Sequence, residues 1–414
     1  MDLSMDLNNF FEMTLSISKP WYIKNIEFDP ELKKIDFYID FEKGALFSSR
    51  NSDCTDSYKA YDTKNKSWRH LNLFEHECYL HCRTPRIKTE LGIELISPPW
   101  DGISPSFTLL FEAFIIELCT KMPVKAVAGT INETDGKIWR MLKKYIEAAR
   151  LNEDFSKIDS VGMDETSRAK KHKYITLFVD MEEKRTIYVT EGKGHETVKN
   201  FSKDLKDHNG LTENILNVSC DMSPAFIKGV EETLPNAKIT YDKFHIVKLI
   251  NDAVDAVRRE EVGLQPLLKK TRYIFLKNQK NLTDKEKEKL KEISLPKLNL
   301  KTVRALTIRE SFQKIYESQT EEEFIFLLQK WYFWATHSRL EPIIKVAKTI
   351  KNHWDGIVEW KRSQINNGIL EGLNSVVQAA KSKARGFRTA EYFKITVYLI
   401  TGQLNFEKVN IYCK

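Results

Sequence analysis

Glycine, proline and cysteine are all scarce in this chain of 414 residues. It contains 16 glycines, 12 prolines and 6 cysteines. So little glycine and proline excludes collagen-like, low-complexity and turn-dense β proteins. The cysteines, at positions 54, 78, 82, 119, 220 and 413, form no disulfide framework over such a length. We therefore expect reduced thiols in a cytoplasmic protein.

Long apolar runs and an export signal are lacking as well. The most apolar stretch, residues 107–119, contains Glu112 and Glu117 and is too short to cross a bilayer. The first residues carry Asp where a secretory signal carries Lys or Arg. The sequence thus predicts no membrane span and no secretion.

The composition that remains is that of a folded protein with a small positive charge. Hydrophobic residues make up 42% of the chain and aromatic residues 11%, which excludes general disorder. The length predicts two to three domains. The 65 Lys and Arg residues exceed the 58 Asp and Glu residues by 7, so the distribution of charge matters more than its total.

Two small modules are predicted at the start of the chain. Residues 1–104 contain short β-type segments separated by polar turns. Residues 105–150 switch to helical spacing, with helices expected at 107–122, 123–131 and 134–150. The last helix is basic and carries Lys137, Arg140 and Lys144 outside its apolar face. A short helix, a tight turn and a basic helix predict a DNA-binding helix-turn-helix, with an ordinary amphipathic hairpin as the alternative.

The remainder is predicted to be an α/β domain with an insertion. Residues 151–262 alternate strands and helices, which favours a sheet that begins antiparallel and continues with parallel crossovers. Residues 263–350 are rich in Lys and Glu and predict an all-helical insertion. Residues 351–414 are again helical. The expected strands are 158–163, 174–180, 186–189, 215–220 and 238–241, and the expected helices are 195–208, 223–234 and 244–260.

Three acids stand out by their position. Asp164 and Asp221 each end a predicted strand, and Glu371 lies in a late helix. Carboxylates at strand ends face the crevice where open α/β sheets bind ligands, and such oxygens are the ligands that Mg²⁺ prefers. Solvated acids are the alternative, and helix capping is a further alternative for Asp221.

Positive charge gathers around these acids. Residues 361–388 contain six basic residues and one acidic residue. Phosphate backbones bind such surfaces through counterion release, although a solvated helical face is the alternative. The candidate DNA-binding cations near the acids are Arg168, Lys170, Lys171, Lys173, Lys381, Lys383, Arg385 and Arg388.

Several sequence blocks resemble the catalytic core of ISL-three-type insertion-sequence transposases. They are GMDETSRAKKHKYITLFVD, VSCDMSPAFIKGV, ITYDKFHIVKLIN and NNGILEGLNSVVQAAKSKARGFRTAEYFKITVYLITG, and the resemblance covers most of the chain from about Tyr61 to Gly402. The resemblance implies an RNase H-like mixed sheet interrupted by an all-α insertion, in the segments 151–262, 263–350 and 351–414. It also implies that Asp164, Asp221 and Glu371 are the catalytic DDE acids and the ligands of Mg²⁺, with Mn²⁺ as an alternative.

The resemblance implies a function. We expect hydrolysis at the element's terminal inverted repeats to expose a 3′-hydroxyl, followed by attack of that hydroxyl on target DNA. The expected partner is double-stranded DNA, bound by a homo-oligomer at the nucleoid of a bacterial cytoplasm. The alternatives are an RNase H-like nuclease without strand transfer and a DNA-binding protein from a decayed element copy.

Four other residues are auxiliary candidates. His245 matches a family block and would contact a phosphate or the third acid, with a structural role as the alternative. Asn374 lies three residues after Glu371, so both share one helix side, and it would orient that acid or bind DNA. Trp331 and Trp334 would stack on an unpaired base, although core packing is the stronger expectation.

The amino-terminal module departs from the family pattern. The relatives carry a zinc ribbon, and tetrahedral zinc needs four ligands. Cys54 stands at the first ligand position, but Ser57 occupies the partner position, and the second pair is absent at Thr89 and beyond. We therefore expect a degenerate ribbon without zinc, and buried thiols at Cys78 and Cys82.

Overall fold

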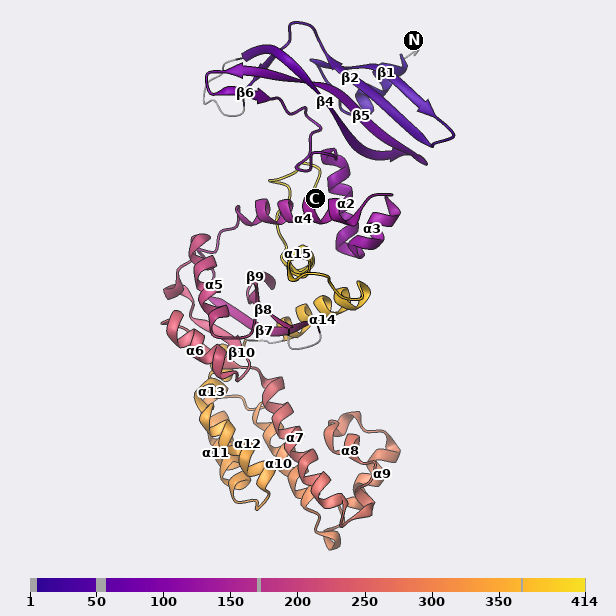
Figure 1. Ribbon diagram of the computed structural model, residues 1–414. Coiled ribbons are helices and arrows are strands. Elements are labelled where there is room, and N and C mark those ends of the chain that lie inside the picture. The colour runs from indigo at the N-terminus through magenta and orange to yellow at the C-terminus, as the bar shows by residue number, and fades with distance from the viewer. Residues whose placement is uncertain (1–5, 50–56, 170–172, 366–367, 414) are drawn as a thin grey trace. The chain divides into compact units, whose positions relative to one another are not determined.

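The computed structural model describes residues 6–49, 57–169, 173–365 and 368–413 (Figure 1). These residues form two compact units. Unit 1 contains Met1–Glu153, Ala380–Arg385 and Gln403–Lys414, and unit 2 contains Asp154–Ala379 and Gly386–Gly402. Each unit combines helices with a mixed β-sheet, which confirms the predicted α/β class.

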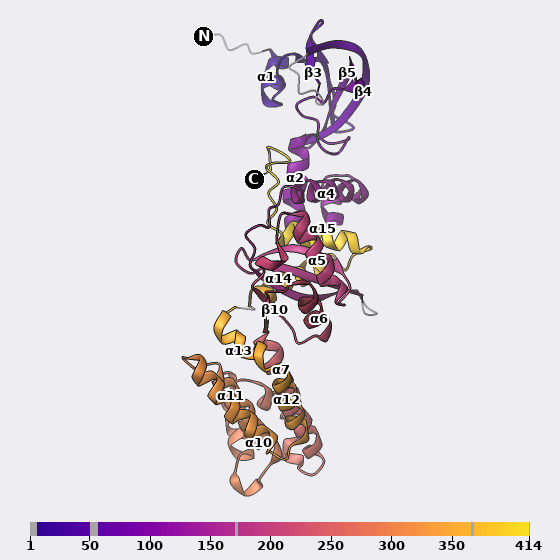
Figure 2. The same cartoon turned by 90° about the vertical axis from the view of Figure 1, so that its left-hand side faces the viewer.

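Unit 1 begins with a strongly twisted sheet in the strand order β1-β2-β5-β4-β3, with β6 paired to β5 (Figures 1 and 2). The long strands β4 and β5 are antiparallel, whereas β2 and β5 are parallel. Their length exceeds the short segments that the sequence predicted, because pairing continues through polar residues such as Asn65 opposite Arg83. The elements are α1 (Leu7–Thr14), β1 (Trp21–Asp29), β2 (Lys34–Phe41), β3 (Leu46–Ser48), β4 (Ser57–Leu73), β5 (His76–Thr89) and β6 (Gly92–Leu95).

Three helices follow the sheet in unit 1. They are α2 (Leu109–Lys121), α3 (Val124–Thr130) and α4 (Asp135–Arg150), close to the predicted ranges. The Thr108 side chain caps α2 by accepting from the backbone N–H of Phe111, as a hydroxyl at this position does. Thr134 stands at the cap position of α4 but makes no capping hydrogen bond with its side chain.

A buried carboxylate ties these helices to a distant part of the chain. Glu112 of α2 accepts hydrogen bonds from the backbone N–H of Ile103 (3.0 Å) and Ser104 (2.6 Å) and from the Tyr145 hydroxyl of α4 (2.6 Å). Asn410 donates its amide to the same Tyr145 hydroxyl and to the carbonyl of Leu109, each at 2.8 Å. The helical part of unit 1 is thus closed by a residue from the last segment of the sequence.

Unit 2 contains a five-stranded sheet in the order β11-β10-β7-β8-β9. The strands β7, β8 and β9 pair antiparallel, and β10 pairs in parallel with both β7 and β11. The predicted antiparallel start and parallel crossovers are therefore confirmed. The strands are β7 (Ser160–Ala169), β8 (Lys173–Asp180), β9 (Arg185–Glu191), β10 (Asn217–Cys220) and β11 (Lys238–Tyr241).

Helices cover both faces of this sheet. On one face, α5 (Glu196–Asp207) and α6 (Pro224–Thr233) bury Phe201 and Phe226, and the Phe201 ring stacks on Phe178 of β8 at 4.5 Å between centroids. On the other face lie α14 (Gly368–Lys383) and α15 (Ala390–Thr401), where the Tyr398 hydroxyl accepts from the backbone N–H of Val189 (3.0 Å).

A helical bundle extends from the sheet of unit 2. Helix α7 (Lys243–Val262) follows β11 directly and runs into the bundle, where α10 and α12 pack against it (Figures 1 and 2). No strand occurs in residues 263–350, all of which the structure describes, as the sequence predicted. The other helices are α8 (Arg272–Leu276), α9 (Asp284–Ile293), α10 (Lys301–Ile315), α11 (Glu321–Thr336), α12 (Glu341–Asn352) and α13 (Trp354–Ser363).

None of the helices in the described ranges is both long enough and apolar enough to span a bilayer.

Candidate active site

Two aspartates lie close together, Asp164 on β7 and Asp221 directly after the neighbouring parallel strand β10. β10 pairs with β7 as far as Ser219 opposite Gly162, and two further residues in that register bring Asp221 beside Asp164. The prediction that Asp164 ends its strand is wrong. The antiparallel pairing of β7 with β8 continues beyond it to Ala169. The parallel pairing stops before Asp164, so the crevice at the end of β10 borders both carboxylates.

A third aspartate continues the row. Cys220 pairs with Tyr241, the last residue of β11, so the register places Asp242, which follows it, beside Asp221. Asp242 is the N-cap of α7, and its Oδ1 accepts from the backbone N–H of Phe244 at 2.7 Å. The sequence analysis overlooked Asp242, although it follows a predicted strand just as Asp221 does.

Helix α14 is docked against the same strand that carries Asp164. Its Leu370 is buried with Val179 and Met181. A methyl group at Gly162 would lie only 2.5 Å from the sulfur of Met181 and 2.8 Å from Cδ2 of Leu370. The absence of a side chain at Gly162 is therefore what allows α14 to approach β7.

Two amide side chains of α14 bind residues of β7. Asn374 donates its Nδ2 to Oδ2 of Asp164, and Gln378 donates its Nε2 to the hydroxyl of Thr166. The Oδ1 atom of Asn374 is buried and has no hydrogen-bond partner among the described residues. Asn374 was predicted to orient Glu371 or to bind DNA; here its side chain contacts the first aspartate.

Two carboxylates in this region, those of Asp164 and Glu165, have raised pKa values. Burial raises the pKa of Asp164 to about 6, and the charge of Asp221 adds to the rise, whereas the Glu165 N–H, His245 and Asn374 oppose it. Burial also raises the pKa of the neighbouring Glu165 to about 7, with further contributions from Asp221 and Asp164 and an opposing one from Lys193. Glu165 was not predicted as a site residue, because no sequence pattern distinguishes an acid that directly follows a proposed ligand.

His245 lies near the first aspartate. It is half-buried in the first turn of α7, and its charge lowers the pKa of Asp164. The centroid of its ring is 5.8 Å from that of Phe244. The structure thus brings the predicted auxiliary histidine to the edge of the sheet that carries the paired aspartates.

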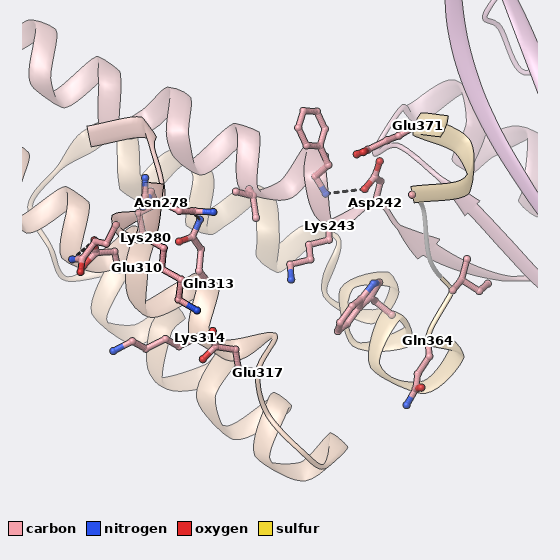
Figure 3. A pocket seen from close by; sticks show the side chains of 17 residues that line it. Asp242, Lys243, Asn278, Lys280, Glu310, Gln313, Lys314, Glu317, Gln364 and Glu371 are labelled. Carbon is pink, nitrogen blue, oxygen red and sulfur yellow. Dashed lines mark hydrogen bonds between the residues drawn. The ribbon is translucent and has the colours of Figure 1, made fainter. Parts of the chain in front are cut away.

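Glu371 lies on the exposed first turn of α14 and faces a cavity. Figure 3 shows the carboxylates of Glu371 and Asp242 pointing toward the same end of this cavity. Asn374, one helical turn farther along α14, contacts Asp164. The structure therefore pairs Asp164 with Asp221 and places Glu371 one turn away from the residue that contacts this pair.

The described residues contain no group of three His, Cys, Asp or Glu side chains arranged to hold a metal ion. The donors nevertheless fit a divalent cation that prefers oxygen. Asp164 and Asp221 are close carboxylates, and the unpartnered Oδ1 of Asn374 is a further buried oxygen beside them.

Comparison with known families identifies the chain. Residues 161–397, which include both aspartates and Glu371, match the model of the ISL3 DDE family, described as a transposase. Residues 106–146 match a second model, described as the helix-turn-helix domain of transposase family ISL3. The chain belongs to the ISL3 family of transposases. The resemblance found in the sequence blocks is thereby confirmed.

Individual transposases of insertion sequences align over most of the chain. The transposase for insertion sequence element IS1001 of Bordetella parapertussis is 27% identical over 349 residues, which cover 82% of this chain and 85% of the relative. The transposase for insertion sequence element IS1557 of Mycobacterium tuberculosis is 24% identical over 362 residues, 79% of each chain.

Within the helix-turn-helix region of this ISL3 transposase, the predicted DNA-binding cations differ in their surroundings. Ile138, Leu142, Tyr145 and Ile146 are buried, as the helical spacing predicted. Lys137 pairs with Glu133 (2.8 Å), and Lys144 donates to the carbonyl of Ile103 (3.1 Å). Arg140 is exposed on α4.

The other predicted DNA-binding cations lie in three segments. Arg168 and Lys173 flank the connection between β7 and β8, whereas Lys170 and Lys171 lie outside the described residues. Lys383 donates to the carbonyl of Lys121 at 2.7 Å, and Lys381 also has a partner. Arg385 and Arg388 are exposed after α14.

The two tryptophans of α11 have different environments. Trp331 is 2% exposed, and its indole N–H donates to the carbonyl of Ile308 at 2.9 Å. Its ring packs edge-on against Phe312 at 4.7 Å. Trp334 is 42% exposed. The core-packing alternative is therefore confirmed for Trp331, which has no surface to offer a base.

The cysteines of the amino-terminal sheet are buried, as expected. Cys78 and Cys82 point into the core of the sheet, and burial raises the pKa of each thiol to about 12. His81 lies between them on the opposite face, where it contacts Ser67 and Asp36. Cys54 lies outside the described residues. Alternation along β5 thus separates Cys78 and Cys82 from His81.

Proposed function

We propose that this ISL3 transposase binds the terminal inverted repeats of an insertion sequence and catalyses DNA cleavage and strand transfer with two Mg²⁺ ions. The proximity of Asp164, on β7, and Asp221, directly after the parallel strand β10, is the observation that carries the proposal. Both residues lie in the segment that matches the transposase model. The sheet order, with three antiparallel strands followed by two parallel ones, supports an RNase H-like arrangement.

In this proposal Asp164, Asp221 and Glu371 are the metal ligands. When bound, the ions supply an activated water or 3′-hydroxyl and stabilise the leaving oxygen of the phosphodiester. Mg²⁺ is proposed because all three donors are hard carboxylate oxygens, and Mn²⁺ is the alternative.

The surrounding residues orient these ligands and influence their ionisation. Asn374 donates its amide N–H to Oδ2 of Asp164, and the backbone N–H of Glu165 donates to Oδ1 at 2.7 Å, so both carboxylate oxygens are held in place. His245, when protonated, favours the ionised form of Asp164. Glu165 interacts electrostatically with both Asp221 and Asp164. We propose that its carboxylate positions the groups around the ligands.

The proposal assigns DNA positioning to the cations. Arg140 and its neighbours on α4 would contact the inverted repeat, and Arg168, Lys173, Arg385 and Arg388 would contact phosphates near the catalytic residues. We propose a homo-oligomer on DNA, at the nucleoid of a bacterial cytoplasm, by the family resemblance and by the DNA substrate.

A cleavage and joining assay tests the function. Purified protein is incubated with Mg²⁺ and duplex DNA that carries the inverted repeats flanking its coding region. We expect the wild type to nick the ends and join them to a target, and Asp164→Asn and Asp221→Asn to do neither while still binding the DNA. Asp207→Asn changes an exposed aspartate of α5 and should leave both steps unchanged.

Two results would contradict the proposal. A wild-type protein that binds the ends without cutting them would be a DNA-binding protein only. Cleavage by Asp164→Asn at the wild-type rate would show that the paired aspartates are not the metal ligands.

A further inference from the structure

A cavity of about 820 Å³ lies beside Glu371 in unit 2. Asp242 and Glu371 stand at one end, and side chains from α10 and from the segment before α9 form the opposite wall (Figure 3). Its lining is part of neither the aspartate pair nor the helix-turn-helix. Its position next to a proposed catalytic acid suggests a role in holding the substrate.

Aromatic surface is available in this cavity. Phe244 lines it next to Asp242 and is 56% exposed. Trp360 also lines the cavity, and its ring is fixed edge-on against Tyr316 at 4.7 Å. The exposed ring of Phe244 and the packed ring of Trp360 thus border the same cavity.

Cations and amides complete the lining. Lys243 lies over the rings of Tyr316 (4.4 Å) and Trp360 (5.5 Å). Lys280 and Lys314 are exposed on the far wall and take part in no ion pair with the residues that the structure describes. The amide of Gln313 donates to Oδ1 of Asn278 at 3.1 Å on that wall.

This combination matches an unpaired nucleic-acid strand better than a duplex. Aromatic faces stack on bases that have left the double helix, and lysines follow the phosphates of a single strand. Glu310 and Glu317 stand among the lysines on the same wall, so stacking on the aromatic rings, which the paired bases of a duplex do not offer, is what favours the single strand.

We propose that this cavity binds an unpaired stretch of the DNA strand next to the cut phosphate, with a base against Phe244 and Trp360. The phosphates of that stretch face Lys280 and Lys314. The inference rests on the proposed function, because it supplies the place where DNA ends are opened. It moves the base-stacking role from Trp331 to residues that border the acids.

A binding experiment with single-stranded DNA tests the cavity without requiring chemistry. The probe is a fluorescein-labelled oligodeoxythymidine of about 10 nucleotides, within the usual site size for such strands. We expect Phe244→Ala to weaken its binding about 10-fold and Phe244→Leu to weaken it as well, since stacking on one ring is worth that much. Phe326→Ala is the matched control, because Phe326 on α11 is also 56% exposed but lies outside the cavity.

The salt dependence of the same binding tests the lysines. Lys280→Ala and Lys314→Ala should each reduce the slope of log affinity against log salt by about 0.7, the value for one phosphate contact on a single strand. Lys285→Ala, an exposed lysine of α9 outside the cavity, should leave the slope unchanged.

Photo-crosslinking locates the bound strand. An oligonucleotide with one 5-iododeoxyuridine should crosslink to Phe244 or Trp360 in the full chain, as read by mass spectrometry of the digested adduct. Crosslinks confined to the helix-turn-helix, or equal affinities for Phe244→Ala and Phe326→Ala, would overturn the inference. Either result leaves the proposed function intact, provided that the wild type still cleaves its ends. A wild-type protein that does not cleave its ends would instead contradict the proposed function.

Discussion

At the scale of single residues, Asp164 and Glu165 are carboxylates whose pKa values are raised in the folded protein. Burial raises the pKa of Asp164 to about 6, and Glu165 beside it has a pKa raised to about 7 by burial and by the two nearby aspartates. The opposing charges, His245 and Lys193, do not cancel this rise. A divalent cation would relieve the repulsion, which is why these carboxylates support the metal proposal.

Asn374 gives the first prediction at this scale. Asn374→Ala removes the amide that holds Asp164, so we expect end cleavage to fall by about 10- to 100-fold, as for other partners of metal ligands. The Mg²⁺ concentration for half-maximal cleavage should rise, which a purely structural role would not require. The measurement is a Mg²⁺ titration of the cleavage rate.

The control for Asn374 is the next residue along the helix. Ser375 is exposed, so Ser375→Ala should leave both the rate and the Mg²⁺ dependence unchanged. An Asn374→Ala protein with the wild-type Mg²⁺ dependence would show that its contact with Asp164 does not serve the metal site.

The sequence identified some of these residues and missed others for a physical reason. The order of the predicted strands and the aspartates that follow two of them were enough to predict that Asp164 and Asp221 lie at the same site. The contact of Asn374 with Asp164 joins residues 210 positions apart, and it depends on how α14 packs on β7. Local periodicity carries no information about such packing, and the acids Glu165 and Asp242 acquire meaning only when the register of the sheet is known.

At the scale of elements, Gly162 lies where α14 packs on the sheet. The helix carries Glu371, Asn374 and Gln378, and its Leu370 side chain occupies space that a side chain at Gly162 would fill. The apolar anchor of Leu370 on Val179 and Met181 then fixes which residues of α14 face β7.

Paired substitutions of glycine test this docking. Gly162→Ala would force Met181 and Leu370 away from β7, and we expect it to destabilise the protein by about 1–3 kcal/mol, as overpacking of a core does, and to reduce end cleavage. Gly372→Ala meets only open space within α14 and should stabilise the helix by up to about 1 kcal/mol.

Thermal denaturation and the cleavage assay measure the two effects. If Gly162→Ala melted at the wild-type temperature and cleaved at the wild-type rate, the close approach of α14 would not be required.

The elements themselves were largely predictable, and their ends were not. The predicted strand 238–241 agrees with β11, and the periodic face of α4 is buried as expected. The first strand was placed at 158–163 but runs over Ser160–Ala169, because antiparallel pairing with β8 carries it through polar residues. A polar hairpin has no apolar alternation to reveal its length, which also explains the underestimated β4 and β5.

At the scale of the whole molecule, the chain passes between its two units more than once. Ala380–Arg385 and Gln403–Lys414 belong to the unit that contains the first 153 residues, and the intervening residues belong to the other. The hydrogen bonds of Asn410 to Tyr145 and Leu109 show what the last segment does there. Sequence reading placed residues 351–414 wholly in the catalytic part, since nothing local marks a return to an earlier module.

The carboxylate in this closing network predicts a dependence of stability on pH. Burial raises the pKa of Glu112 to about 7 from an ordinary value of 4.5, so the folded state retains a proton that the unfolded state releases between these values. The stability contributed by this proton is fully present below pH 4.5 and is lost as pH rises through 7, by about 3 kcal/mol in total.

Comparison with a variant that does not titrate isolates this effect. The free energy of unfolding of the wild type minus that of Glu112→Gln should therefore fall between pH 5 and pH 7.5, as measured by thermal denaturation. Glu117→Gln, an exposed position on the same helix, should show no such change. A constant difference between wild type and Glu112→Gln would contradict the prediction.

The return of the chain to its first unit also bears on synthesis at the ribosome. A nascent chain that has emerged only as far as residue 400 already contains α2, α3, α4 and all three proposed catalytic acids, but it lacks the Asn410 amide that Tyr145 and Leu109 bind. The unit that contains the helix-turn-helix is therefore completed after the catalytic residues have been translated. Products that stop before Asn410 lack the hydrogen bonds that this residue makes with Tyr145 and Leu109.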